Sequence, residues 1–186
     1  ATLKPYVAQG SAELVHMSHQ LMMNLAAHNA GVDRPTGTPE ETDRLYNYMM
    51  KFIEGATLAH TTRDPEVVKG EITESMSLFD AEFIAPSVQR RQALIAEVAA
   101  GNAPESTLPL DILTVLLRNE DALHIEHHTL VREIAFFLLA GAHTSATAFV
   151  RTLDNLFTWL EKHPEDSELV HTNREFVQHA VYETIR

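Results

Sequence analysis

The sequence has no cysteine among its 186 residues. Disulfides, thiolate metal sites and a cysteine nucleophile are therefore excluded for this chain. Basic residues are also few, since 14 lysines and arginines stand against 26 aspartates and glutamates and give a formal net charge of -12. Nucleic acids and anionic membrane surfaces attract clustered positive charge. The acidic balance therefore argues against both as partners.

Targeting signals and strand-like patterns are lacking as well. The first residues, Ala1-Thr2-Leu3-Lys4-Pro5, contain no apolar signal-peptide core, and no Asn-x-Ser/Thr glycosylation site occurs. We therefore expect a cytoplasmic protein. Because no alternating apolar pattern of useful length appears, the expected fold class is all-α, as a single helical segment over residues 1–186.

No residue from Ile134 to Val150 carries a formal charge at neutral pH. This run begins with six consecutive apolar residues, and its second half carries four polar ones, His143, Thr144, Ser145 and Thr147. A membrane span needs about 20 apolar residues, so this shorter, partly polar run favours a buried central helix over about 126–162. We expect the beginning of the run to be enclosed by other elements on all sides.

Gly141 is an exception within this helix, because glycine in a helix interior costs roughly 1 kcal/mol relative to alanine. One explanation is that a neighbouring helix packs closely against it. The other is that the hydroxyl of Thr144, three residues on, diverts helical carbonyls and loosens the hydrogen-bond ladder, which would open a groove for a ligand. Both explanations remain open at the level of sequence.

Helical periodicity and capping residues predict the other elements. A helix over about 11–29 is expected to bury one face, and a helix capped by Thr38 is expected to bury another. Further helices are expected over about 65–83, from 88 to 100 after an interruption at Pro86, over 110–119 with a cap near Asp111, and from 172 or 173 to the end. The expected buried residues of the first two helices are Leu14, Met17, Leu21, Leu25 and His28, and then Leu45, Tyr48, Met49, Phe52, Ile53 and Ala56.

Two histidine patterns have the spacing of metal ligands. Glu13-x-x-His16 has the spacing that di-iron helical bundles use, and His124 and His128 lie at i and i+4. The first pattern occurs only once, and acidic residues flank the second. A solvated surface is therefore the favoured interpretation of both.

Three motifs resemble the cytochrome P450 family of haem-thiolate monooxygenases. The segment Ala140-Gly141-Ala142-His143-Thr144-Ser145 is similar to the family's oxygen-groove motif in the middle of a long central helix. The segment Leu160-Glu161-Lys162-His163-Pro164-Glu165 is similar to the end of that helix, and Glu183-Thr184-Ile185-Arg186 to the family's Glu-x-x-Arg helix. Their order and short spacing resemble the soluble bacterial members, specifically over about 110–186 and only generally over 1–109.

The resemblance implies the helical portion of the P450 fold and a role for each matching residue. Ala140 and Gly141 would line the face of haem b in the intact parent protein, and Phe137 would face the substrate pocket. Thr144 would help to deliver the protons that direct cleavage of the O–O bond. Glu183 and Arg186 would form a structural pair. The implied reaction inserts one oxygen atom of O2 into a small apolar substrate, with electrons from a ferredoxin-type donor.

The sequence departs from the family at His143, where an acidic residue is usual. A histidine there would relay protons if it titrates near ambient pH, or it would be a polar residue with satisfied hydrogen bonds. The family's axial cysteine is absent, so no thiolate is available to the iron.

We therefore expect a truncated or internal fragment that is inactive by itself and retains little or no haem. Apolar faces left uncovered would favour a homodimer. The alternatives are a non-redox helical module that binds a partner helix or apolar ligand, and a metal-binding bundle that uses Glu13, His16, His124 or His128.

Overall fold

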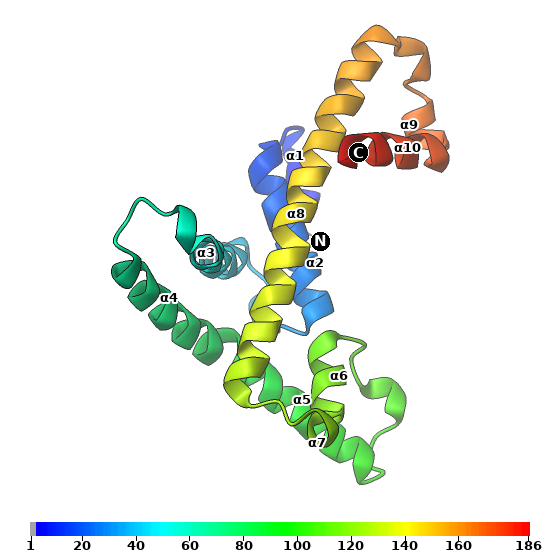
Figure 1. Ribbon diagram of the computed structural model, residues 1–186. Coiled ribbons are helices and arrows are strands. Elements are labelled where there is room, and N and C mark those ends of the chain that lie inside the picture. Colours follow the sequence, from blue (N-terminus) through cyan, green and yellow to red (C-terminus); the bar gives the residue numbers. More distant parts are fainter. Residues whose placement is uncertain (1–2) are drawn as a thin grey trace. The chain divides into compact units, whose positions relative to one another are not determined.

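The computed structural model describes residues 3–186 and is helical (Figure 1). No strand occurs within these residues, so the all-α class is confirmed. The longest element is α8, the 36-residue helix His127–Lys162, which is the helix expected over about 126–162. The other helices are α1 Lys4–Gln9, α2 Leu14–Ala30, α3 Pro39–Ala56, α4 Pro65–Phe79, α5 Ala85–Ala99, α6 Ile112–Arg118, α7 Glu120–Leu123, α9 Leu169–Thr172 and α10 Arg174–Ile185, with a π turn at Asp80–Ile84 and 3₁₀ turns at Leu58–His60, Glu105–Thr107 and Pro164–Asp166.

The chain groups into two compact units. The middle unit is Met23–Ala142, and the terminal unit combines the residues up to Met22 with His143–Arg186. The boundaries fall inside α2 and α8, so each of these two helices contributes residues to both units.

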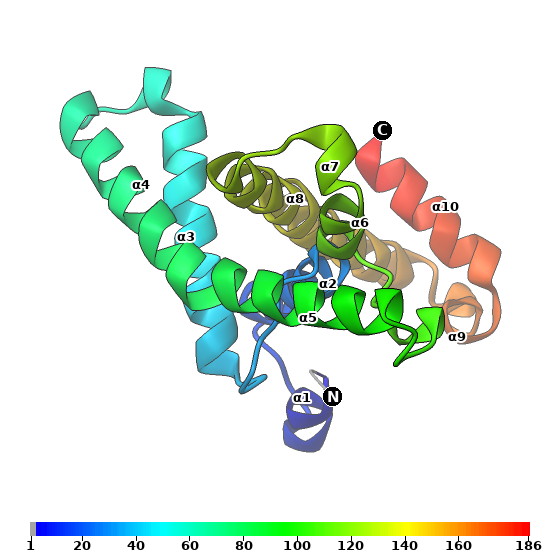
Figure 2. The same ribbon diagram turned by 90° about the horizontal axis from the view of Figure 1, so that it is seen from below.

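The middle unit has an apolar core with an aromatic centre. Phe79 is fully buried and lies with its ring centroid 5.5 Å from that of Phe52, 6.0 Å from that of Tyr48 and 6.2 Å from that of Phe83. The helices α3 and α4 lie side by side (Figures 1 and 2). The predicted burial of Leu45, Met49 and Phe52 on α3 is confirmed, because a clear apolar stripe faces this core.

The predicted buried face of α2 is wrong. The helix buries Met23, Ala27 and Ala30, whereas Leu25 is 52% exposed and His28 is exposed. Apolar residues surround much of this helix, from Leu21 to Ala27. Periodicity alone therefore does not select the side that packs.

The predicted interruption at Pro86 is also wrong. A π turn joins α4 to α5, in which the backbone N–H of Ala85 bonds to the carbonyl of Asp80, and Pro86 lies in the first turn of α5. Proline has no N–H to donate and is tolerated in the first helical turn. The wider π turn before it allows the chain to stay helical.

A buried ion-pair network joins α5 to the start of α6. The guanidinium of Arg91 lies 2.7 Å from a carboxylate oxygen of Asp111 and 3.2 Å from one of Asp33, and the side chains of Arg91 and Asp111 are only 3% and 4% exposed. Asp111 also accepts the backbone N–H of Thr114 at 2.8 Å, which confirms the predicted helix cap. Burial alone would raise the pKa of Asp111, but hydrogen bonds from Arg91 and Thr114 outweigh it and hold the pKa below its usual range.

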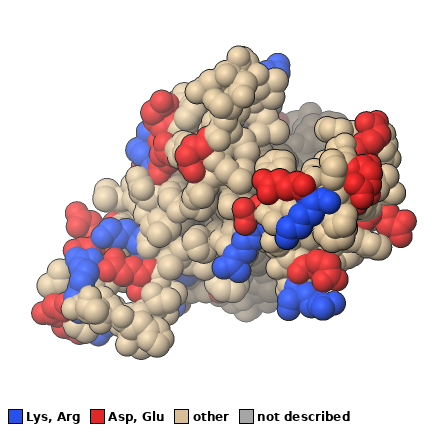
Figure 3. Space-filling model, turned by 90° about the horizontal axis from the view of Figure 1, so that it is seen from above, with Lys and Arg blue, Asp and Glu red and all other residues tan. Residues whose placement is uncertain are grey.

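Outside this network, many basic side chains lie beside acidic ones on the surface (Figure 3). Examples are Arg44 with Glu82 at 2.8 Å, Lys51 with Glu71 at 2.7 Å and Arg118 with Glu105 at 2.6 Å. Exposed pairs of this kind contribute little stability. Their main effect is that positive charge is compensated locally.

Candidate functional site

The candidate site is an exposed strip on one side of α8. Phe137, Ala140, Gly141 and Thr144 follow at i, i+3, i+4 and i+7, so they share one side of the helix. All four are exposed, Phe137 by 39%. We call these four residues the α8 strip.

The expected enclosure of this part of α8 on all sides is therefore wrong. Ile134, Leu138 and Ala142 are buried in the core of the middle unit, whereas Phe136 is 61% exposed. The core covers one side of the helix and leaves the side with the α8 strip open. Two exposed phenylalanine rings, with centroids 6.2 Å apart, stand at the beginning of the strip.

Gly141 is not required by close packing. A Cβ added to it would meet only the Cβ of Ala26, at 3.7 Å, which is an ordinary contact distance. The local loosening expected at Thr144 is absent too, because α8 is α-helical without interruption from His127 to Lys162. What Gly141 provides is a surface without a side chain in the middle of the α8 strip.

We expect Gly141→Ala to raise the free energy of unfolding by about 1 kcal/mol, because alanine is the better helix former and its Cβ fits. Urea denaturation followed by circular dichroism measures this change. The matched control is Gly31→Ala, since Gly31 has a φ of +90° and an added Cβ would lie 2.6 Å from Asp111 Oδ1. That variant should be clearly destabilised. A loss of stability in Gly141→Ala would restore the close-packing explanation.

His143 faces a second histidine rather than solvent alone. Its ring stacks on that of His19 from α2, with centroids 6.1 Å apart and planes inclined by 29°. The Nδ1 atom of His143 is buried and has no hydrogen-bond partner in the part of the chain that the structure describes. Of the two explanations for His143, the one that requires satisfied hydrogen bonds therefore does not hold at Nδ1.

Glu183 and Arg186 contact each other near the end of α10, with Arg186 Nη1 3.5 Å from Glu183 Oε1. Their side chains are 67% and 80% exposed. An ion pair this exposed contributes little to stability. Any structural role for the pair therefore requires a further partner.

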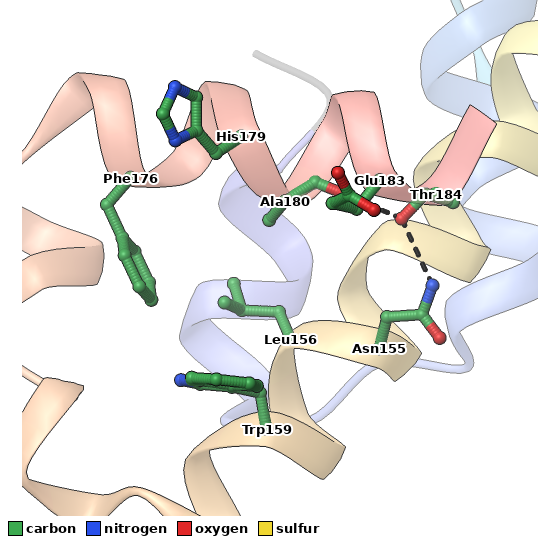
Figure 4. A pocket seen from close by; sticks show the side chains of 8 residues that line it. All are labelled: Asn155, Leu156, Trp159, Phe176, His179, Ala180, Glu183 and Thr184. Atoms are coloured by element: carbon green, nitrogen blue, oxygen red, sulfur yellow. Dashed lines mark hydrogen bonds between the residues drawn. The ribbon is translucent and has the colours of Figure 1, made fainter. Parts of the chain in front are cut away.

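Sequence reasoning missed a groove between the last turns of α8 and α10 in the terminal unit (Figure 4). Its volume is about 370 Å³, and the amide of Asn155 donates a 3.1 Å hydrogen bond to the hydroxyl of Thr184 at one end. Trp159, the only tryptophan, forms one wall, and its indole N–H donates to Asp166 at 2.8 Å. The lining residues are Asn155, Leu156, Trp159, Phe176, His179, Ala180, Glu183 and Thr184.

The structure describes the local surroundings of both histidine patterns. The carboxylate of Glu13 accepts the backbone N–H groups of Val15 and His16, at 3.0 and 2.6 Å, and so caps the start of α2. His124 has a left-handed conformation after α7, whereas His128 belongs to α8, so the two do not share a helix face. Within residues 3–186, no three His, Asp or Glu side chains gather closely enough to hold an ion.

By length and composition alone, α8 is able to cross a membrane, and 28% of its most apolar window is buried. The core helix of a soluble protein meets the same criterion. Comparisons of the chain with protein-family models, with curated protein sequences and with solved structures found no match.

Proposed function

We propose that this chain is the oxygen-side part of a cytoplasmic haem-thiolate monooxygenase of the cytochrome P450 type. The parent enzyme would insert one oxygen atom of O2 into a small apolar substrate and take electrons from a ferredoxin-type donor. The observation that carries the proposal is the α8 strip. It is uncharged, exposed and small at Ala140 and Gly141, and it ends with the hydroxyl of Thr144.

The residues of the α8 strip fit the face of a haem. A flat, largely apolar ring needs a smooth apolar surface, and Gly141 offers one without a Cβ, between Phe137 and Thr144. No charged residue occurs from Ile134 to Val150. The chain fits only the face of the haem ring. It supplies no thiolate ligand to the iron, because none of the 186 residues is a cysteine. The thiolate must come from elsewhere in the parent protein.

When bound, haem supplies the redox chemistry and the binding of O2, and its thiolate ligand favours cleavage of the O–O bond. The chain's own residues shape the space beside it. Ala140 and Gly141 keep that space open because their side chains are small or absent. Phe137 provides an apolar wall for a substrate.

Thr144 places a hydroxyl one helical turn beyond Gly141, where it is able to hold and pass on a proton. Thr144 continues the uninterrupted helix α8, whose residues Ile134, Leu138 and Ala142 are all less than 5% exposed. Small residues beside one hydroxyl leave room for a reactant and keep a proton donor within reach of it.

The test uses the protein encoded by the uninterrupted coding region. After reduction and exposure to carbon monoxide, its haem should show the red-shifted Soret band of thiolate ligation. The matched control replaces the ligating cysteine of that protein by serine and should lose the band. The 186-residue chain alone should retain little haem. A folded, haem-loaded parent without the thiolate band would refute the proposal.

A second candidate is a non-redox module that binds an apolar ligand, and the groove lined by Trp159 and Phe176 favours it. In that case, anilinonaphthalene sulfonate should bind the chain and quench the fluorescence of Trp159. The half-buried Ala180 lines the same groove, so Ala180→Arg should abolish this quenching. Binding that survives in Ala180→Arg would exclude the groove as the ligand site.

A further inference from the structure

In the terminal unit, the groove between the last turns of α8 and α10 has two chemically different ends (Figure 4). Trp159 and Phe176 lie at one end, and Asn155, Glu183 and Thr184 lie at the other. Its volume of about 370 Å³ is near the lower limit of small-molecule sites. The groove therefore has the size and the division of polarity for a small molecule with an apolar body and a polar head.

The aromatic end presents a ring that is held by two contacts. The ring of His163 stacks on Trp159, with centroids 4.0 Å apart and planes inclined by 22°. The indole N–H of Trp159 donates to Asp166 at 2.8 Å, and the residue is nevertheless 47% exposed. An aromatic surface already held in place loses little side-chain entropy when a ligand packs on it. This end of the groove therefore suits an aromatic ring.

At the polar end, Thr184 and Glu183 offer only hydrogen-bond acceptors to a ligand. The hydroxyl of Thr184 donates to the carbonyl of Ala180 at 2.8 Å and accepts from the amide of Asn155 at 3.1 Å. What this hydroxyl has left is an acceptor lone pair, and an ionised carboxylate such as that of Glu183 accepts only. A ligand head that donates hydrogen bonds therefore fits this end better than one that accepts them.

The charge at the polar end is negative. Among the described residues that line the groove, Glu183 carries a formal charge and none is Lys or Arg. Arg186 Nη1 lies 3.5 Å from Oε1 of Glu183, but the Arg186 side chain is 80% exposed, and Oε2 has no partner within residues 3–186. His179 also lines the groove and lies 4.0 Å from Glu175, outside it. A positively charged head would compensate Glu183, whereas a neutral one would only displace its water.

We propose that this groove binds a small organic ammonium ion with an aromatic body. The aromatic body lies against Trp159 and Phe176, and the ammonium group donates hydrogen bonds to Glu183 and Thr184. The inference rests on the second candidate function, a non-redox module that binds an apolar ligand, and it adds the positive charge of that ligand. The anionic anilinonaphthalene sulfonate tests only whether the groove takes an apolar body.

The first test compares three probes that differ in the head group, namely 4-phenylbutylamine, 4-phenylbutanol and 4-phenylbutyrate. Trp159 is the only tryptophan, so a blue shift of its emission reports a probe that removes water from its ring. The titration is done at pH 8, where the amine is charged and histidine side chains are largely neutral. The amine should bind about 5-fold tighter than the alcohol, the upper end of what an exposed ion pair contributes. The carboxylate should bind least, and about 0.5 M salt should narrow these differences.

The second test removes the charge of Glu183. Glu183→Gln keeps the size of the side chain, so the amine and the alcohol should then bind alike. Glu175→Gln is the matched control, because Glu175 is an exposed acid of the same helix that does not line the groove. This control should keep the preference for the amine. Binding of the alcohol to Glu183→Gln verifies that the groove is intact, and if that variant does not fold, the three probes on the unmodified chain decide.

The outcomes separate this inference from the function on which it rests. Equal affinities for the amine and the alcohol in the unmodified chain would overturn the ammonium ligand and leave the second candidate function intact. A preference for the amine that survives in Glu183→Gln would have the same meaning. If none of the three probes shifts the emission of Trp159, the second candidate function fails together with this inference.

Discussion

Replacing Asp111 by alanine should destabilise the chain by about 3–5 kcal/mol, because it leaves the guanidinium of Arg91 buried without its main partner. Arg91 is only 3% exposed and cannot turn to water without moving α5. The substitution also removes the cap of α6, which typically contributes about 1 kcal/mol. Few single changes in this chain combine two such losses.

Urea denaturation followed by circular dichroism measures the effect, and Arg90→Ala is the matched control. Arg90 immediately precedes Arg91 in the chain and contacts Asp33 at 2.6 Å, but its side chain is 48% exposed. Arg90→Ala should lower the free energy of unfolding by less than about 1 kcal/mol. The double change Arg91→Met with Asp111→Asn keeps a capping side chain and leaves no buried charge, so it should cost less than Asp111→Ala. Equal losses for Asp111→Ala and Arg90→Ala would contradict the role of burial.

The advantage of Asp111 should also depend on pH. Its pKa in the folded chain lies below the unfolded value of about 4. The stability it contributes is therefore fully present above about pH 4 and is lost as the pH falls through the folded value. The difference between the unmodified chain and Asp111→Ala should narrow in acid. A constant difference down to pH 2 would contradict this assignment.

Under the proposed monooxygenase function, Thr144→Ala in the haem-loaded parent should lower the product formed per electron by about 100-fold, the lower end of what a positioned proton donor contributes. Electron consumption should continue, and the electrons should appear as hydrogen peroxide, because the oxygen is then released before its O–O bond is cleaved. Oxygen uptake, peroxide and product are measured in the same sample.

Thr147→Ala is the control for that experiment. Thr147 is also an exposed threonine of α8, its hydroxyl donates a 3.1 Å hydrogen bond to the carbonyl of His143, and it lies outside the α8 strip. The control should keep the yield of the unmodified enzyme. A similar loss in both variants would show that the effect comes from α8 as a whole rather than from the hydroxyl of Thr144.

The features that sequence reasoning predicted correctly are local. Thr38 caps α3 by accepting the backbone N–H of Glu41, and Asp111 caps α6 by accepting that of Thr114. Asn173, at the predicted start of the last helix, caps α10. Each cap involves residues two or three positions apart, so the local order of residue types is sufficient to predict it. The length of α8 follows for the same reason, from an uncharged stretch that continues into a helical pattern.

The buried side of a helix is not a local property. Both α2 and the first half of α8 carry apolar residues around much of their circumference, so several faces are equally suited to packing. The core of the middle unit selected Met23 and Ala27 on α2, and it left Phe136 and Phe137 of α8 exposed. That selection is what made the α8 strip accessible.

The order of residues alone establishes an all-helical chain, one long helix with an uncharged stretch inside it, the helix caps, and the motif that contains Gly141 and Thr144. Tertiary structure alone brings His19 against His143, places Arg91 on Asp111 and opens the groove beside Trp159. The physical reason is the separation in sequence between the residues that interact. Capping and helix formation depend on hydrogen bonds within a few residues, whereas ring stacking, buried ion pairs and grooves depend on which distant helices meet.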